Sequence, residues 1–315
     1  MTWRRYDEER DGEELARIWH EVGWVDGTDA HAAGLRTFFS SGHGLVAPAD
    51  GEVEAAIHWV PGTYRWLDHD VPAAAVSALT TGFVGRRRGH GPTLVAEALA
   101  QMVDAGVEVA TLGAFEQGYY DRFGFGADPY DHRLTFDPGA LRVPIPDRRP
   151  VRIGTDDHAE VQALLARRHR SHGGLVLDHA RGMEAALAWR KDPWGLGLRA
   201  DDGRLTGVVL GEAGGEHGPH TVEWLLYETT TDLLELLGVL RLLSDQVWTV
   251  VVDEPPDVRL QDLLDAPNRQ RAHLSQAGRG GVANTAHSWR QTRILDLAAC
   301  LGRVHWPGEP FAFDL

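Results

Sequence analysis

The sequence predicts an α/β (α+β) protein of two successive units, each with a mixed central sheet flanked by helices. Its 315 residues exceed what one ordinary hydrophobic core contains, so two domains are expected. A linker with Pro144, Pro146 and Pro150 lies near the middle of the chain and marks a break between elements. After it the alternation of strand and helix patterns begins again, which indicates a second unit of similar architecture.

The first half begins with a short strand at 2–6 and an amphipathic helix, in which Leu15, Ile18 and Trp19 recur at helical spacing. An apolar run at 73–83 ends just before three arginines. Such a run is typical of a central strand covered on both faces. The other elements expected here are a helix around 30–39, strands at 44–47, 52–60 and 63–67, a helix at 93–105, and strands at 107–112 and 131–136.

The second half repeats this order of elements. We expect a strand at 151–153, helices at 157–169 and 179–189, strands at 196–200, 205–212 and 221–227, a helix at 231–244, a strand at 247–252 and a short helix near 260–264. A further change occurs near 287–294, where a strand leads into a helix at 296–301. The predicted domains are therefore 1–145, 150–285 and 286–315.

Composition narrows the function classes. The net charge of −15, from 46 acidic and 31 basic residues, disfavours nucleic acid and anionic membrane as partners. It would attract cationic amines, although acidity can also serve solubility alone. No run of about 18 apolar residues and no N-terminal apolar region of a secretory signal occurs. The single cysteine, Cys300, excludes an internal disulfide and a cysteine-based zinc cluster. We expect a cytoplasmic protein.

A basic, glycine-rich loop lies between the apolar run and the helix at 93–105. It reads Arg-Arg-Arg-Gly-His-Gly over residues 86–91. Free N–H groups and the positive end of a helix dipole favour a pyrophosphate at such a position. Gly89 and Gly91 would permit close backbone approach. The loop is neither a P-loop nor a dinucleotide fingerprint, and by itself it could also be a solvated basic turn.

A second motif follows about 30 residues later. Residues 113–126 read GAFEQGYYDRFGFG, in which Tyr120, Arg122 and Phe123 belong to a Y-x-R-F-G-F pattern. Tyrosines such as Tyr119 and Tyr120 are more often core aromatics. The two motifs in this order, separated by a helix and a strand, nevertheless favour a functional interpretation.

These two motifs resemble the R/Q-x-x-G-x-G/A loop and the Y-x-R-F-G-F signature of GNAT acetyltransferases. The chain is similar to the Eis (enhanced intracellular survival) type, which has two tandem GNAT-like domains and a sterol-carrier-like C-terminal domain. The resemblance implies an N-acetyltransferase that uses acetyl-CoA, no metal, and direct attack by an amine. It also implies a homo-oligomer, since multidomain relatives form hexamers. Residues 1–145 would be catalytic, 150–285 would lack the CoA motif, and 286–315 would begin the third domain.

The resemblance also implies roles for individual residues. Tyr120 would protonate the leaving thiolate as general acid. The residues that would bind acetyl-CoA are Leu79, Thr80 and Thr81 through their backbone, Arg86, Arg87, Arg88, Gly89, His90, Gly91 and Pro92 around the pyrophosphate, and Phe115 with Glu116 in the position of a Ser-Glu pair. Phe115 in place of serine is a departure, so a side-chain hydrogen bond at that position is in doubt.

The general base is left unassigned. In the Eis type the terminal carboxylate returns to the active site, whereas only about 20 residues follow Ile294 here. Either the chain is truncated relative to its natural form or Leu315 has no such role. We favour truncation, because a lone helix and strand could not bury a core. The acceptor also stays open among aminoglycosides, polyamines, lysine side chains and small metabolites.

Other candidates are weaker. His169 with His172, and His217 with His220, lack an accompanying pattern such as H-E-x-x-H, so we interpret them as loop histidines. Cys300 is more consistent with core packing than with a nucleophile. Either acceptor binding through cation–π contact or ordinary packing would explain the residues Trp19, Trp24, Phe38, Phe39, Asp26 and Asp29. The alternative function is a catalytically silent acyl-CoA- or lipid-binding scaffold.

Overall fold

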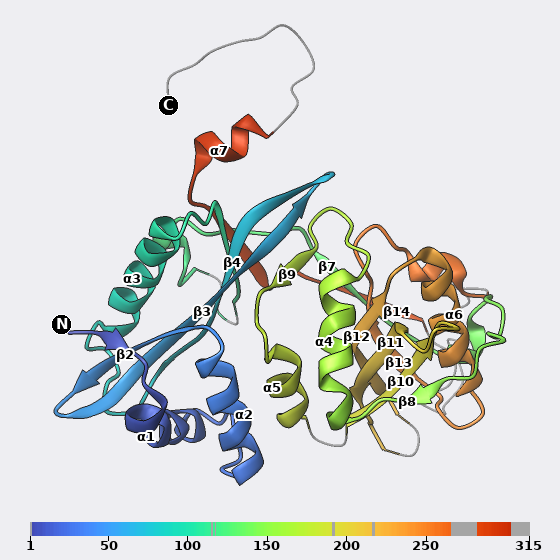
Figure 1. Ribbon diagram of the computed structural model, residues 1–315, viewed down its shortest axis with the longest axis horizontal. Helices are drawn as coiled ribbons and strands as arrows, with labels where there is room; N and C mark the ends of the chain where they lie inside the picture. Colours follow the sequence, from blue (N-terminus) through green and yellow to red (C-terminus); the bar gives the residue numbers. More distant parts are fainter. Residues whose placement is uncertain are drawn as a thin grey trace, which may run out of the picture.

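The computed structural model describes residues 2–114, 116, 118–190, 193–215, 218–265 and 282–303. Two mixed sheets lie side by side, with helices α4 and α5 between them (Figure 1). In the described part of the chain, no helix has both the length and the apolarity that crossing a membrane requires. The architecture is the mixed α/β fold that the sequence predicts.

The first sheet has the strand order β1-β2-β3-β4-β5-β15-β6, and β9 pairs with β3 outside this path. Only β4 and β5 run parallel; every other neighbouring pair is antiparallel. The strands are β1 (Arg4–Arg5), β2 (His43–Ala49), β3 (Glu52–Trp66), β4 (His69–Thr81), β5 (Val109–Gly113), β15 (Arg290–Ile294), β6 (Gly126–Ala127) and β9 (Leu175–Leu177). The strands expected at 52–60 and 63–67 are thus one continuous strand, and the apolar run is the central strand β4.

The second sheet repeats this order, read as β8-β10-β11-β12-β13-β7-β14, with β12 and β13 as its parallel pair. Its strands are β8 (Val151–Arg152), β10 (Pro193–Arg199), β11 (Leu205–Glu212), β12 (His220–Tyr227), β13 (Val250–Asp253), β7 (Asp131–Phe136) and β14 (Ala283–His287). Strands β9 and β14 are absent from the sequence prediction, because each is short and lacks a regular alternation of buried and exposed residues.

Helices cover both faces of each sheet. They are α1 (Glu8–Glu21), α2 (Asp29–Ser40), α3 (His90–Asp104), α4 (His158–Arg167), α5 (Gly182–Ala188), α6 (Thr230–Leu242) and α7 (Leu297–Gly302), with short 3-10 turns at Asp121–Phe123, Pro138–Ala140, Thr155–Asp157 and Leu260–Leu263. In the first sheet, α3 packs on one face and α1 with α2 on the other. In the second, α6 covers one face and α4 with α5 the other.

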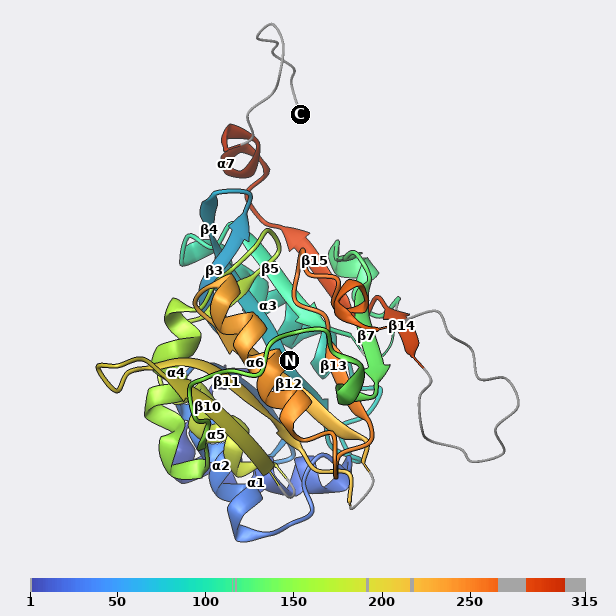
Figure 2. The same ribbon diagram turned by 90° about the vertical axis from the view of Figure 1, so that its right-hand side faces the viewer.

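The two halves of the sequence exchange a strand. The strand expected to end the first unit, β7, pairs with β13 in the second sheet. The strand expected to open a third domain, β15, lies beside β5 in the first sheet (Figure 2) and pairs on its other edge with β6. The sequence predicts both strands, but it does not predict which sheet each strand joins. The reason is that the alternation of side chains along a strand does not specify its neighbour. The domain boundaries at 145, 150 and 286 remain predictions.

Candidate active site

The first sheet opens where β4 and β5 separate. Their parallel pairing ends at Val76–Leu112, although β4 continues to Thr81. Opposite β3, Ala56 faces Thr80 and His58 faces Ser77, so two residues of β4 lie opposite Ile57 alone. This is a β-bulge, and bulges bend a strand away from its neighbour. The bend opens a cleft of about 820 Å³.

The cleft brings together most residues that the sequence singled out. Its lining consists of Leu79, Thr80, Thr81, Arg86, Arg87, Gly89, His90, Gly91, Pro92, Glu116 and Tyr120, together with Trp24, which was a candidate for acceptor binding, Tyr119 and Arg122 of the second motif, and Val22 and Gly85, which were not singled out. Arg88 is the exception among the described candidates, because it does not line the cleft and pairs instead with Asp50 at 3.3 Å. Phe115 lies outside the described residues.

Helix α3 begins at the cleft with an N-terminus that no side chain caps. Its N-cap residue is Gly89, whose φ of +81° suits glycine. By contrast, α1 has a side-chain cap from Asp7, and α2 from Thr28. An uncapped N-terminus leaves N–H groups and the positive dipole end for an anion. At Gly91 an added Cβ would lie 2.6 Å from the Tyr119 hydroxyl, so glycine lets this tyrosine approach the helix.

The turn before the arginines is held by the carboxylates of Glu54, which is buried, and Glu21, which is partly exposed, and neither was predicted from the sequence. The Gly85 N–H donates to Glu54 Oε2 at 2.8 Å, and the Phe83 N–H donates to Glu21 Oε2 at 2.8 Å. Arg17 donates to both carboxylates, at 2.6 Å to Glu21 and 3.2 Å to Glu54. The signal in the sequence was a glutamate inside the apolar stretch of β3. We call Arg17, Glu21 and Glu54 the loop-anchoring cluster.

Tyr120 stands at the other side of the cleft, in a turn that follows β5. Its side chain is only 7% exposed and packs edge-on against Tyr119 and Phe125. Burial, with a smaller contribution from Tyr119, raises the pKa of Tyr120 to about 12. The phenol is therefore protonated at neutral pH and can donate a proton.

The aromatic residues near the first helices divide into two groups. Trp19 and Phe39 are buried in the core under α1 and α2, and Phe38 packs against this core at 5.8 Å from Phe39 between ring centroids. Trp24 is 43% exposed and lines the cleft. Of the two acidic candidates, Asp26 pairs with His31 at 2.7 Å, whereas Asp29 begins α2. Neither lines this cleft, so packing explains most of this set.

The other candidates are histidines and Cys300, whose contacts are known except for His217. His172 accepts a hydrogen bond from the Leu67 N–H at 3.1 Å, and His169 lies 3.3 Å from the Ser171 hydroxyl. Among the residues that the structure describes, no group of three or more His, Cys, Asp or Glu side chains could hold a metal ion. His217 lies outside them. Cys300 packs beside Val71, and burial raises the pKa of its thiol.

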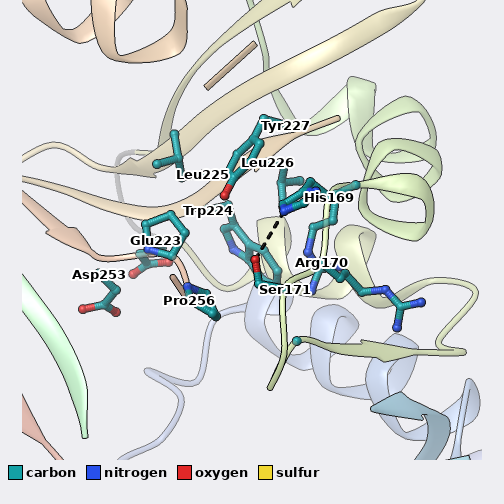
Figure 3. A pocket seen from close by; sticks show the side chains of 13 residues that line it. His169, Arg170, Ser171, Glu223, Trp224, Leu225, Leu226, Tyr227, Asp253 and Pro256 are labelled. Carbon is teal, nitrogen blue, oxygen red and sulfur yellow. Dashed lines mark hydrogen bonds between the residues drawn. The ribbon is translucent and has the colours of Figure 1, made fainter. Parts of the chain in front are cut away.

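The second sheet has a similar opening, but the chain segment after α4 pairs with the end of β12 there. The pairing of β12 with β13 ends at Val222–Val252, and a pocket of about 190 Å³ follows. His169, Arg170 and Ser171 line it from the segment after α4 (Figure 3), and the His169 N–H donates to the Tyr227 carbonyl at 2.7 Å. The free volume is thus less than a quarter of that in the first cleft.

The first part of the chain, which contains this cleft, is similar to a known family of domains. Residues 4–127 match the family model of the acetyltransferase (GNAT) domain. These residues form a GNAT acetyltransferase domain. An uncharacterized N-acetyltransferase of Streptomyces avermitilis is 25% identical over 255 residues, which cover 76% of this chain and 60% of the relative. The chain therefore spans about three fifths of the length of that relative.

Solved structures extend the likeness beyond the GNAT domain. A probable N-acyltransferase from Enterococcus faecalis V583 has 16% identity and a TM-score of 0.72, covering 94% of this chain and 73% of its own. Eis1 from Mycobacterium abscessus has 20% identity and a TM-score of 0.71, covering 96% of this chain and 76% of its own. At these identities the likeness establishes the fold, which includes both sheets.

Proposed function

We propose that the protein is an acetyl-CoA-dependent N-acetyltransferase that transfers the acetyl group to an amine by direct attack, with Tyr120 as general acid. One observation carries the proposal. A single cleft combines the diverging end of β4, an uncapped helix start with Arg86 and Arg87 beside it, and the protonated phenol of Tyr120.

The two halves of the cleft would bind different parts of acetyl-CoA. The pyrophosphate would lie at the start of α3, where backbone N–H groups donate and arginines neutralise charge. The pantetheine arm would pair with the backbone of Leu79, Thr80 and Thr81, which extend beyond the pairing with β5. Glu116, which lines the same cleft, would lie near the acyl end. This arrangement would place the thioester close to Tyr120.

The reaction then follows from placing two reactants together. The acceptor nitrogen attacks the thioester carbonyl, a C–N bond forms, and the C–S bond breaks. Tyr120 gives its phenolic proton to the departing thiolate, and the proton released by the acceptor nitrogen returns to the phenol through solvent. The phenol carries its proton at neutral pH, and burial, which raises its pKa, keeps it protonated until the thiolate forms.

We extend the proposal to the whole chain as an enzyme of the Eis type. The fold match to Eis1 supports a second GNAT-like unit over 150–285, and the small pocket at β12 and β13 supports its lack of an acyl-CoA site. A cytoplasmic homo-oligomer and an amine acceptor free in solution or on a protein belong to the same proposal.

Release of free thiol from acetyl-CoA tests the function. We would follow it colorimetrically with kanamycin, spermidine and a lysine-containing peptide as acceptors. Tyr120→Phe should lower kcat about 100-fold and leave the acetyl-CoA Kd within about twofold, because the phenol acts on the leaving group only. Tyr130→Phe is the matched control, since Tyr130 is exposed and does not line the cleft.

The outcomes separate the alternatives. Unchanged turnover in Tyr120→Phe would remove this residue from the mechanism. If the protein binds acetyl-CoA but releases no thiol with any of the acceptors, the catalytically silent scaffold would be favoured instead.

A further inference from the structure

The turn that carries Tyr120 is supported by a strand from the far end of the chain. Strand β15 pairs antiparallel with β5 from Arg290–Gly113 to Ile294–Val109. On its other edge it pairs with β6 at Gln291–Ala127 and Thr292–Gly126. The segment matched by the GNAT family model ends at residue 127, so this support comes from outside it.

One face of β15 contacts both ends of the turn. Side chains two residues apart on a strand point to the same face, which here holds Gln291 and Arg293. Gln291 Nε2 donates to the carboxylate of Asp121 at 3.2 Å. Asp121 is the residue that follows Tyr120 in the sequence. Arg293 donates to the Phe123 carbonyl at 2.5 Å. The turn therefore has a side-chain hydrogen bond near its beginning and another near its end.

Packing alone does not account for a glutamine at this position. Gln291 is 2% exposed, and its Oε1 atom is buried without a hydrogen-bond partner among the described residues. A buried amide oxygen without a partner costs free energy that an apolar side chain of similar volume would avoid. What glutamine supplies and leucine could not is the hydrogen bond to Asp121.

We propose that Gln291 and Arg293 are positioning residues that orient Tyr120 for proton transfer, so that β15 completes the active site of the GNAT domain. This inference rests on the proposed function. Within the described residues no hydrogen bond holds the Tyr120 hydroxyl, and its direction depends on ring packing and on the turn. A displacement of about 1 Å at a reacting group can lower a rate about 100-fold.

The test compares Gln291→Leu with Thr292→Val. Thr292 lies next to Gln291 on the same strand, but its hydroxyl faces Thr111 at 3.4 Å and not the turn. For Gln291→Leu we expect kcat to fall about 10- to 100-fold, with the acetyl-CoA Kd by calorimetry within about twofold. Amide hydrogen exchange in residues 118–127 should become faster. Thr292→Val should change none of these.

A double substitution separates positioning from a general loss of structure. In a Tyr120→Phe background, Gln291→Leu should cause no further loss of kcat, because there is no proton left to place. An equal fractional loss in both backgrounds would overturn the proposal, as would unchanged turnover in Gln291→Leu. If Gln291→Leu lowers the Tm so far that the protein is not folded in the assay, Arg293→Met provides the same comparison.

The measurement of amide hydrogen exchange distinguishes this inference from the proposed function. It needs neither acetyl-CoA nor an acceptor, so a protein without thiol release can still show whether Gln291 holds the turn. Unchanged exchange at 118–127 would refute the contact itself. Faster exchange in a protein that releases no thiol would refute the acetyltransferase and leave β15 as a purely structural support.

Discussion

Replacing Glu54 by glutamine should loosen the loop that precedes the helix α3 N-terminus. Glu54 is 2% exposed and accepts from the Gly85 N–H and from Arg17. Glutamine has nearly the same shape, but its amide offers one acceptor and one donor group. If the amide oxygen still accepts from the Gly85 N–H, the NH₂ group faces the guanidinium of Arg17. Both groups are donors, so no hydrogen bond can form between them.

The expected cost follows from the contacts. A hydrogen bond to a charged group contributes about 1.5–3 kcal/mol. In the variant Arg17 would still pair with Glu21, which lies 2.6 Å away, and the Arg17 side chain is one-third exposed. The lower part of that range therefore applies. We expect a loss of about 2 kcal/mol in the free energy of unfolding, which corresponds to a fall in Tm of roughly 4–8 °C. The acetyl-CoA Kd should rise several-fold, because the turn at 82–85 leads directly into the arginines.

Urea unfolding, thermal melting and calorimetric titration with acetyl-CoA measure these effects. Glu52→Gln is the matched control, because Glu52 lies on the same strand, its side chain is 69% exposed, and it approaches Arg17 only to 3.9 Å. Such an exposed pair contributes about 0–1 kcal/mol. Equal stability and equal affinity in the two variants would refute the role of the loop-anchoring cluster.

Three further predictions concern pH, packing and truncation. Burial lowers the pKa of His58 to about 3 from 6.5, so wild type should lose stability as pH falls below 6.5, by up to about 1.4 kcal/mol per pH unit more than His58→Leu; parallel urea curves would contradict this. Gly85→Ala would place a Cβ 2.8 Å from that of Glu54 and should cost about 1–3 kcal/mol, whereas Gly126→Ala, where a Cβ meets nothing within 4 Å, should be near neutral. Residues 1–145 alone lack β15 and should show no cooperative unfolding by circular dichroism; a cooperative transition with acetyl-CoA binding would disprove the dependence on that strand.

The candidate site was largely predictable because its motifs are local. Gly89, His90 and Gly91 are consecutive, and the geometry of a helix start follows from the residues that form it. Tyr120 could be placed by its own short pattern and by its order after the loop. The place of Arg88 was not predictable in this way, because a run of three arginines in the sequence does not indicate which of them points away from the cleft to pair with Asp50.

Contacts between distant segments were not predictable in the same way. Glu54 lies 31 residues from Gly85 along the chain, and Gln291 lies 170 residues from Asp121. The sequence pattern around Glu54 does not indicate Gly85 as its partner, and the pattern around Gln291 does not indicate Asp121. Each contact exists because two strands meet in one sheet or because a helix packs beside it.

The sequence by itself determined the alternation of helices and strands, the phosphate-type loop at residues 86–91 and the tyrosine that follows it, since each depends on neighbouring residues and on backbone chemistry. Only the tertiary structure decided that β7 and β15 exchange sheets and that the loop-anchoring cluster and a distant strand support the cleft. The physical reason is that backbone hydrogen bonds between strands are the same for every residue type, so a strand's sequence specifies its buried face but not its neighbour.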